Sequence, residues 1–131
     1  MMRAFRKYIF VIIFVSVVSG SFAQVVSVSA KLDTNAMLIG DHVGMTLKYS
    51  GPAKSQVVWP FMPDTILGSI TIIGRGKIDT SYTADKKAVT LIQQMNITCY
   101  DSGFYTIPSI LFKYRILPDT ANQSATTTML P

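Results

Sequence analysis

The chain has 131 residues, room for one domain, and is rich in Val, Ile, Thr and aromatic residues, with no Glu. Twelve basic residues against seven acidic ones give a formal net charge of +5, but three of the basic residues stand within the first seven positions. From residue 24 onward the net charge falls to +2, the difference between nine basic and seven acidic residues. The composition therefore favours an all-β protein and argues against nucleic acid as a partner.

The N-terminal segment, residues 1–23, has the organisation of a secretory signal peptide. A positively charged start precedes an apolar run over residues 8–18, which is shorter than the roughly 20 residues that a membrane-spanning helix needs. Small residues follow, and the pattern predicts cleavage between Ala23 and Gln24. An uncleaved membrane anchor is the alternative. We therefore expect an exported protein of the bacterial periplasm or cell envelope, with one mature domain over residues 24–131.

Alternating apolar and polar residues predict most of the strands of that domain. The clearest patterns cover residues 26–32, 43–49 and 88–100, and in the last of these Gln93 is the polar exception on the apolar face. Further strands are predicted over residues 56–59, 69–73, 77–83, 104–117 and 124–130, with turns at Ser50-Gly51-Pro52 and Gly74-Arg75-Gly76. About seven or eight strands at this spacing predict an immunoglobulin-like antiparallel β-sandwich. Cys99 is the only cysteine, so no disulfide within the chain supports the core.

A corner motif lies between the two longest predicted strands. Asp101 and Gly103 predict a tight turn, because glycine adopts backbone angles that a Cβ forbids. Tyr105 then begins the next strand, which bends at Pro108. In a tyrosine corner the ring is buried and its hydroxyl bonds to backbone a few residues upstream, and we expect this of Tyr105.

An unusually apolar loop contains Trp59, Phe61 and Met62 between two prolines. It is interpreted either as a plug over one end of the sandwich or as a site for a protein partner. Trp59 together with Tyr82 and Tyr100 is also a candidate aromatic platform for sugar, although single aromatic residues in a β-sandwich usually pack in the core or at an edge.

No catalytic, cofactor or metal constellation is visible in the sequence. His42 is the only histidine and falls on the polar face of its strand, so it is interpreted as solvated rather than as a zinc ligand, because zinc normally takes three or four ligands. Cys99 falls on an apolar face, where a thiol is inert. The chain is therefore predicted not to be an enzyme, without a cofactor or metal.

Two short patterns suggest a modification. Thr65 and Thr120 each follow an Asp and precede an aliphatic residue, as in the O-glycosylation pattern of some exported bacterial proteins, and both fall in predicted loops. Three-residue patterns also arise by chance. An unmodified intact mass of the protein from its own host would exclude this modification.

The strings 31-KLDTN-35, 39-IGD-41 and 101-DSGFYTIP-108 together resemble a known family. They are similar to the N-terminal immunoglobulin-like domain of BatD-like (oxygen-tolerance) proteins of bacterial envelopes. The resemblance covers roughly residues 25–131 and concerns turns and corners, not chemistry. Members of that family typically continue into further domains and a C-terminal transmembrane helix, so the resemblance implies either a truncated piece or a stand-alone relative.

These observations predict a non-enzymatic exported module that contacts unknown envelope protein partners as part of a BatD-like protein. Contacts are expected through strand edges or end loops. Nucleic acid is not an expected partner, and a membrane is expected only through the signal segment or a missing C-terminal anchor. The alternative function is a carbohydrate-binding or adhesive surface module.

Overall fold

A computed structural model describes residues 25–118 and 121–130 of the chain. The regular elements of this part are the strands β1 Ser27–Leu32, β2 Val43–Pro52, β3 Ser55–Val58, β4 Thr65–Ile66, β5 Ile70–Tyr82, β6 Ala88–Cys99, β7 Leu111–Ile116, β8 Gln123–Thr126 and β9 Thr128–Leu130. Within these residues no helix has the length and apolar character needed to span a membrane. The prediction of an all-β chain is confirmed. The predicted signal peptide with Ala23 and Gln24, and the candidate Thr120, lie outside the described residues.

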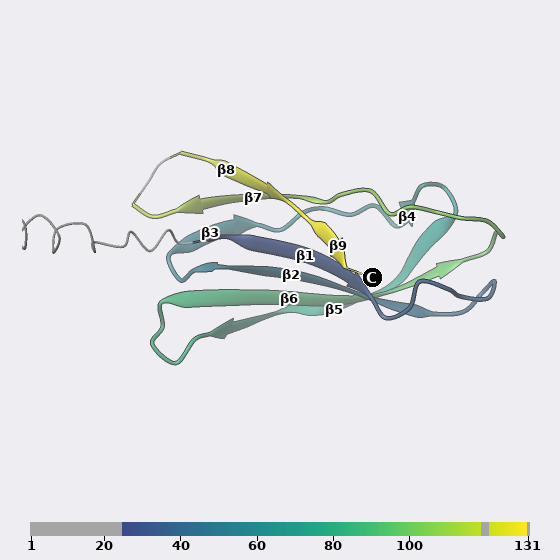
Figure 1. Cartoon of the computed structure of the whole chain (residues 1–131), viewed down its shortest axis with the longest axis horizontal. Coiled ribbons are helices and arrows are strands. Elements are labelled where there is room, and N and C mark those ends of the chain that lie inside the picture. Colours follow the sequence, from purple (N-terminus) through teal and green to yellow (C-terminus); the bar gives the residue numbers. More distant parts are fainter. Residues whose placement is uncertain (1–24, 119–120, 131) are drawn as a thin grey trace, which may run out of the picture.

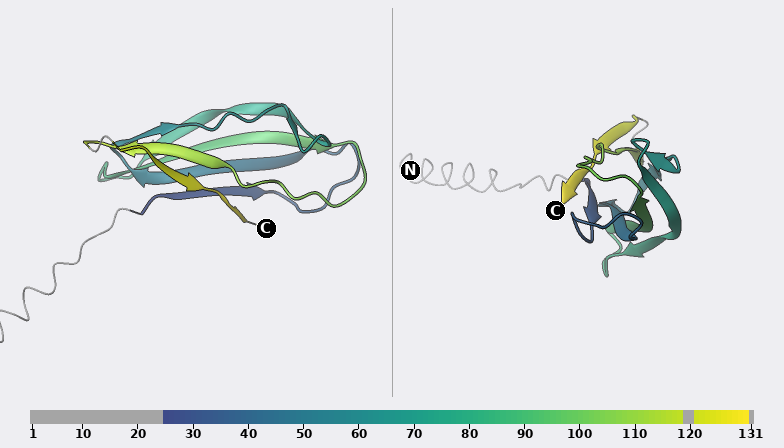
Figure 2. Two further views of the ribbon diagram at one scale, coloured as in Figure 1. Left: turned by 90° about the horizontal axis from the view of Figure 1, so that it is seen from above. Right: turned by 90° about the vertical axis from the view of Figure 1, so that its right-hand side faces the viewer.

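The strands form two sheets (Figure 1). The larger has the order β4-β5-β6-β2-β1-β9 and the smaller has the order β3-β7-β8. β9 runs parallel to β1, and every other pairing among the described strands is antiparallel. Figure 2 shows that the large sheet curls around the core, so that the arrangement is sandwich-like with one strongly curved layer.

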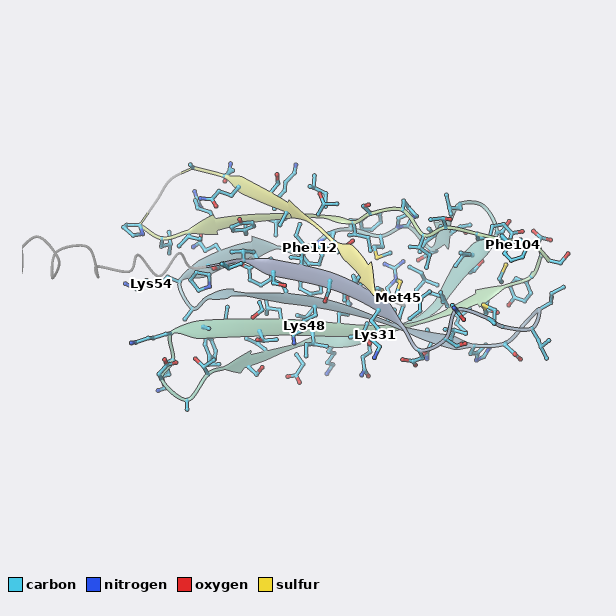
Figure 3. The ribbon with its side chains drawn as sticks, in the orientation of Figure 1. Lys31, Met45, Lys48, Lys54, Phe104 and Phe112 are labelled. Carbon is cyan, nitrogen blue, oxygen red and sulfur yellow. The ribbon has the colours of Figure 1, made fainter. Side chains whose placement is uncertain are left out.

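The core lies where the two sheets face each other. Phe112 from β7 stacks against Tyr49 from β2, with ring centroids 6.4 Å apart, and meets the edge of Trp59 at 5.0 Å. Both Phe112 and Tyr49 are fully buried, as is Met45, which lies on the same face of β2 as Tyr49 (Figure 3). Full burial of side chains of this size contributes about 1.5–3 kcal/mol each, which is how the fold is held without a disulfide.

The period-of-two pattern is confirmed in the strands where it is clearest. Val28 and Ala30 of β1 are buried, as are Val43, Met45, Leu47 and Tyr49 of β2. β6 buries Val89, Met95, Ile97 and Cys99 on the predicted face. These three strands are neighbours in the large sheet, which has its inner face against the core, so alternation follows directly from the pleat.

The predicted turn at Gly74-Arg75-Gly76 is wrong. β5 continues through these residues, and the pairing with β6 shifts register between Ile72 and Gly74 and again between Arg75 and Ile78. Irregularities of this kind absorb extra residues without ending a strand. Glycine is required at position 76, because a Cβ there would stand 2.8 Å from the carbonyl oxygen of Gln94. The local turn signal therefore marks a bulge.

Three further boundaries differ from the sequence prediction. β2 continues through Ser50-Gly51-Pro52, since Pro52 stands opposite Ala88 at the strand end. The strand predicted from residue 104 begins only at Leu111. The last predicted strand is divided: β8 pairs with β7 and β9 pairs with β1, and the buried Thr127 lies at the crossing between the sheets. Thr127 fixes the crossing by donating its backbone N–H to the Ile110 carbonyl and accepting the Ile110 N–H at its hydroxyl, both at 2.9 Å.

Candidate functional site

Two segments far apart in the sequence close over one end of the molecule. The loop after β1, residues 33–42, is joined to the segment after β6, residues 100–110, where the Gly40 N–H donates to the Cys99 carbonyl at 2.9 Å. Between them lies a hollow of about 560 Å³, which we call the distal cup. It is lined by residues 32, 34–39, 43, 70, 97, 99 and 101–107. Its size is that of a ligand or side-chain pocket.

Large apolar side chains surround the distal cup without being buried by it. Phe104 is fully exposed, and Leu38 and Ile39 are each more than half exposed. Figure 3 shows Phe104 at one extremity of the molecule and Lys54 at the other. Isolated surface apolar residues are normal, but several on adjacent loops around one hollow are typical of an interaction surface.

The backbone beside the distal cup is unpaired. Residues 104–109 contain no turn or bend, and none of their N–H or carbonyl groups bonds to another described residue. Ile107 and Ile110 are buried and hold this segment against the body, while Phe104, Tyr105 and Thr106 face outward. In Figure 1 the segment runs back from the far end of the molecule to β7. A backbone edge of this kind accepts a further strand.

The charge at this end is acidic. The two loops together carry Asp33, Asp41 and Asp101, all exposed, with no Lys or Arg. Asp41 Oδ2 accepts the Leu38 N–H at 3.1 Å, and Asp101 Oδ2 accepts the Ser69 hydroxyl at 3.3 Å. Both carboxylates keep one oxygen for other contacts.

The opposite end of the molecule is basic. Lys54 lies in the β2–β3 turn, and Lys86 and Lys87 lie in the β5–β6 hairpin loop, whose only acidic residue is Asp85. The Ala53 N–H joins these turns by donating to the Lys87 carbonyl at 2.9 Å. Charge is therefore separated along the long axis of the molecule.

The corner residues take part in the distal cup. Gly103 has a φ of 149°, and the Tyr105 ring folds back over it, so that a Cβ at Gly103 would meet the ring at 3.5 Å. The Tyr105 hydroxyl donates to the Ser102 carbonyl at 3.4 Å. The expectation of a buried ring is wrong, because Tyr105 is 38% exposed. With β7 beginning six residues further on, no layer covers the ring, and Pro108 is exposed within the unpaired segment.

The residues of the apolar loop that contains Trp59, Phe61 and Met62 differ in burial, which bears on its interpretation as a plug or as a partner site. Met62 is buried, and Trp59 is half-buried, with its indole N–H donating to Gln93 Oε1 at 2.6 Å. Phe61 is 89% exposed. The burial of Met62 and Trp59 agrees with the plug interpretation for these two residues, and Phe61 is the exposed aromatic residue of the loop.

The remaining candidate residues do not converge. His42 is exposed, and no group of three or more metal-ligating side chains occurs among the described residues. Cys99 is buried, with its thiol donating to the Asp101 carbonyl at 3.2 Å. Tyr82 stands beside Val89 at one end of β6 and Tyr100 follows the other end, roughly 35 Å away at the usual rise of a strand, so these residues form no common platform for sugar. Thr65 is exposed but lies in β4, not in a loop.

A second hollow of about 420 Å³ runs along β3, β7 and β8. Its basic residues are Lys113 and Arg115, and Arg115 already donates to Gln56 Oε1 at 2.8 Å. It lacks a fully exposed aromatic side chain such as Phe104, although β3 and β8 are the two edge strands of the small sheet. The distal cup is therefore the candidate site.

The sequence contained part of the signal for this site. The string from Asp101 to Pro108 was recognisable as a corner, but its pairing with the loop of Leu38 and Ile39 depends on tertiary contacts. Comparison with known proteins finds no matching family, and no curated protein or solved structure matches the chain.

Proposed function

We propose that this protein is a non-enzymatic, exported module that makes protein–protein contacts in the bacterial cell envelope through its distal cup. The observation that carries the proposal is the cup itself: exposed apolar side chains, led by Phe104, surround a hollow of about 560 Å³ beside unpaired backbone. Export is supported by the positive, apolar and small-residue parts of residues 1–23.

We also propose that the domain is immunoglobulin-like. Without β4 and β9, the large sheet has the order β5-β6-β2-β1 and the small sheet has the order β3-β7-β8. Lettered in chain order, these are the D-E-B-A and C-F-G sheets of a constant-type immunoglobulin domain. Trp59, directly after the strand equivalent to C, packs against Phe112 as a core tryptophan does in such domains. The exposed Tyr105 is a departure from that pattern.

The similarity of 39-IGD-41 and 101-DSGFYTIP-108 to BatD-like proteins supports membership of a BatD-like assembly in the envelope. In the proposed arrangement the partner is an envelope protein and no nucleic acid takes part. The resemblance also implies a C-terminal membrane anchor, which the downstream coding sequence tests. A transmembrane helix encoded there supports the anchor, and a stop codon directly after Pro131 removes it.

The contact itself is tested by site-specific photocrosslinking in the living host. A photoreactive amino acid at Phe104 is expected to join the protein to one defined envelope partner. The matched control is the same amino acid at Lys48, which is exposed on the outer face of the large sheet (Figure 3). Equal crosslinking from both positions, or none from position 104, contradicts the proposed site.

A further inference from the structure

We infer that the distal cup binds an extended peptide segment of the partner, which adds a strand to residues 104–109, places an apolar side chain in the cup and sets a Lys or Arg near Asp101. This inference rests on the proposed function and names the chemistry of the partner. Three separate properties of the site lead to it: its backbone, its hollow and its charge.

The backbone determines the form of the peptide. Strand addition requires N–H and carbonyl groups that are exposed and unpaired. Residues 104–109 form no backbone hydrogen bond to another described residue, and all of them except Ile107 are exposed, although Pro108 has no N–H to offer. Ile107 and Ile110 anchor the segment to the core, so it is held in place before a peptide arrives. A fixed edge lowers the entropy cost of binding.

The hollow determines the side chains. Alternate residues of a strand point to opposite sides, so every second side chain of an added strand would face the cup. The cup floor is apolar, with Ile97, Ile70 and Val43 buried, and its rim carries Leu38 and Phe104. A volume of about 560 Å³ accepts apolar side chains of the size of Val, Ile or Phe.

The charge determines which peptides are favoured. Asp101 lines the cup, Asp33 and Asp41 stand in the adjoining loop, and neither loop contains a Lys or Arg to balance them. A cationic peptide is therefore attracted and an acidic one is repelled. A second copy of the chain would offer Lys54, Lys86 and Lys87, but these lie in turns whose backbone is already hydrogen-bonded, including the Lys86 N–H to the Thr83 carbonyl at 2.8 Å.

The experiment selects the peptide from a phage-displayed library of random nonapeptides, panned against the full chain as its host produces it. We expect enriched sequences with alternating apolar or β-branched residues and at least one Lys or Arg, and depletion of Asp and Glu. Enrichment of acidic sequences, or of sequences without alternating apolar positions, overturns the inference. A failure to enrich any sequence also overturns it.

Variants then separate strand pairing from side-chain contact. Thr106→Pro removes one exposed N–H and is expected to weaken binding of the selected peptide at least about tenfold, while the matched Thr106→Ala leaves it unchanged. Asp101→Asn keeps the acceptor for Ser69 and is expected to weaken binding about two- to fivefold, with less effect at high salt. Equal binding by the Pro and Ala variants overturns the strand addition.

A last comparison distinguishes failure of this inference from failure of the proposed function. Phe104→Ser changes a fully exposed side chain, so the fold is expected to be retained. If crosslinking to the envelope partner depends on Phe104 but not on the Thr106 N–H, the protein contact stands and strand addition is wrong. If sedimentation shows a dimer that Phe104→Ser dissociates, the occupant is a second copy, and the inferred peptide is wrong.

Discussion

The indole N–H of Trp59 donates to the Oε1 atom of Gln93 at 2.6 Å, which explains the polar residue on the apolar face of β6. The other end of the same amide donates to the Gly76 carbonyl at 2.9 Å. One side chain thus connects the end of β3, the middle of β6 and the bulge in β5. Gln93 is a structural bridge between the two sheets.

Gln93→Leu is expected to lower the free energy of unfolding by about 1–2 kcal/mol, because the half-buried indole N–H loses its acceptor. The measurement is urea unfolding followed by Trp59 fluorescence. Gln94→Leu is the matched control, since Gln94 is exposed on the opposite face and its change is expected to stay within about 0.5 kcal/mol. Equal losses in both variants would show that the bridge contributes nothing.

Gly76→Ala is expected to destabilise the fold by about 1–3 kcal/mol, because the new Cβ would stand 2.8 Å from the Gln94 carbonyl oxygen and backbone has to shift. At Gly74 the nearest atom to a new Cβ is 3.7 Å away, so Gly74→Ala is expected to be neutral or slightly stabilising. Thermal unfolding of the two variants compares them directly. The bulge geometry is wrong if both alanines behave alike.

Leu67→Asn is expected to stabilise the fold by about 1 kcal/mol. Leu67 has a φ of 55° in the turn between β4 and β5, a left-handed conformation that is unfavourable for Leu and well tolerated by Asn, and its side chain is 54% exposed. Leu111→Asn is the control, because Leu111 is about equally exposed but lies in β7. The expected order of melting temperatures is Leu67→Asn above wild type, and Leu111→Asn at or below it.

Tyr49 makes stability sensitive to alkaline pH. Burial raises the pKa of its phenol, so the folded state holds the proton more tightly than the unfolded state. Its contribution to stability is complete below about pH 10, the unfolded value, and is lost as the pH rises through the higher folded pKa. Urea titrations at increasing pH are expected to show this loss.

Tyr49→Phe is expected to remove that alkaline loss. At neutral pH the variant is expected to be as stable as wild type or up to about 1 kcal/mol more stable, because the buried hydroxyl has no hydrogen-bond partner among the described residues. Tyr82→Phe, at an exposed site, serves as the control and is expected to keep the wild-type pH profile. An unchanged alkaline profile in Tyr49→Phe would contradict the assignment.

The Cys99 thiol is expected to react with a thiol reagent at least about a hundredfold more slowly in the native protein than in urea, because modification requires the structure to open. The measurement is the rate of absorbance change with a chromogenic disulfide. Rapid native labelling would contradict the burial of the Cys99 thiol.

The sequence predicts a strand correctly where packing against the core requires alternating apolar and polar residues, and less well where pairing with an adjacent strand decides the structure. β1, β2 and β6 follow their alternation because each packs one face against the core. The composition of Gly74-Arg75-Gly76 is that of a turn, yet β5 continues through these residues because it pairs with β6. Residues 104–109 have a strand's composition, yet β3 ends at Val58 before Pro60, so no described strand extends beside them.

The distal cup was harder to predict than the strands. Its two halves are separated by about sixty residues, and their contact depends on the bond from the Gly40 N–H to the Cys99 carbonyl, which no local pattern encodes. Gln93 shows the same limit: the sequence marks it as an exception on its face, and only the approach of Trp59 and Gly76 explains why it is there.

The parallel pairing of β1 with β9 has a mechanical consequence. Ser29 stands beside Thr128 and Lys31 beside Leu130, so the first and last strands run side by side in the same direction. If the domain is pulled at the start of β1 and the end of β9, the hydrogen bonds of this pair are loaded together in shear instead of opening one after another, because the two pulling points lie at opposite ends of the parallel pair. The β1–β9 pair is therefore expected to resist tension applied along its two strands.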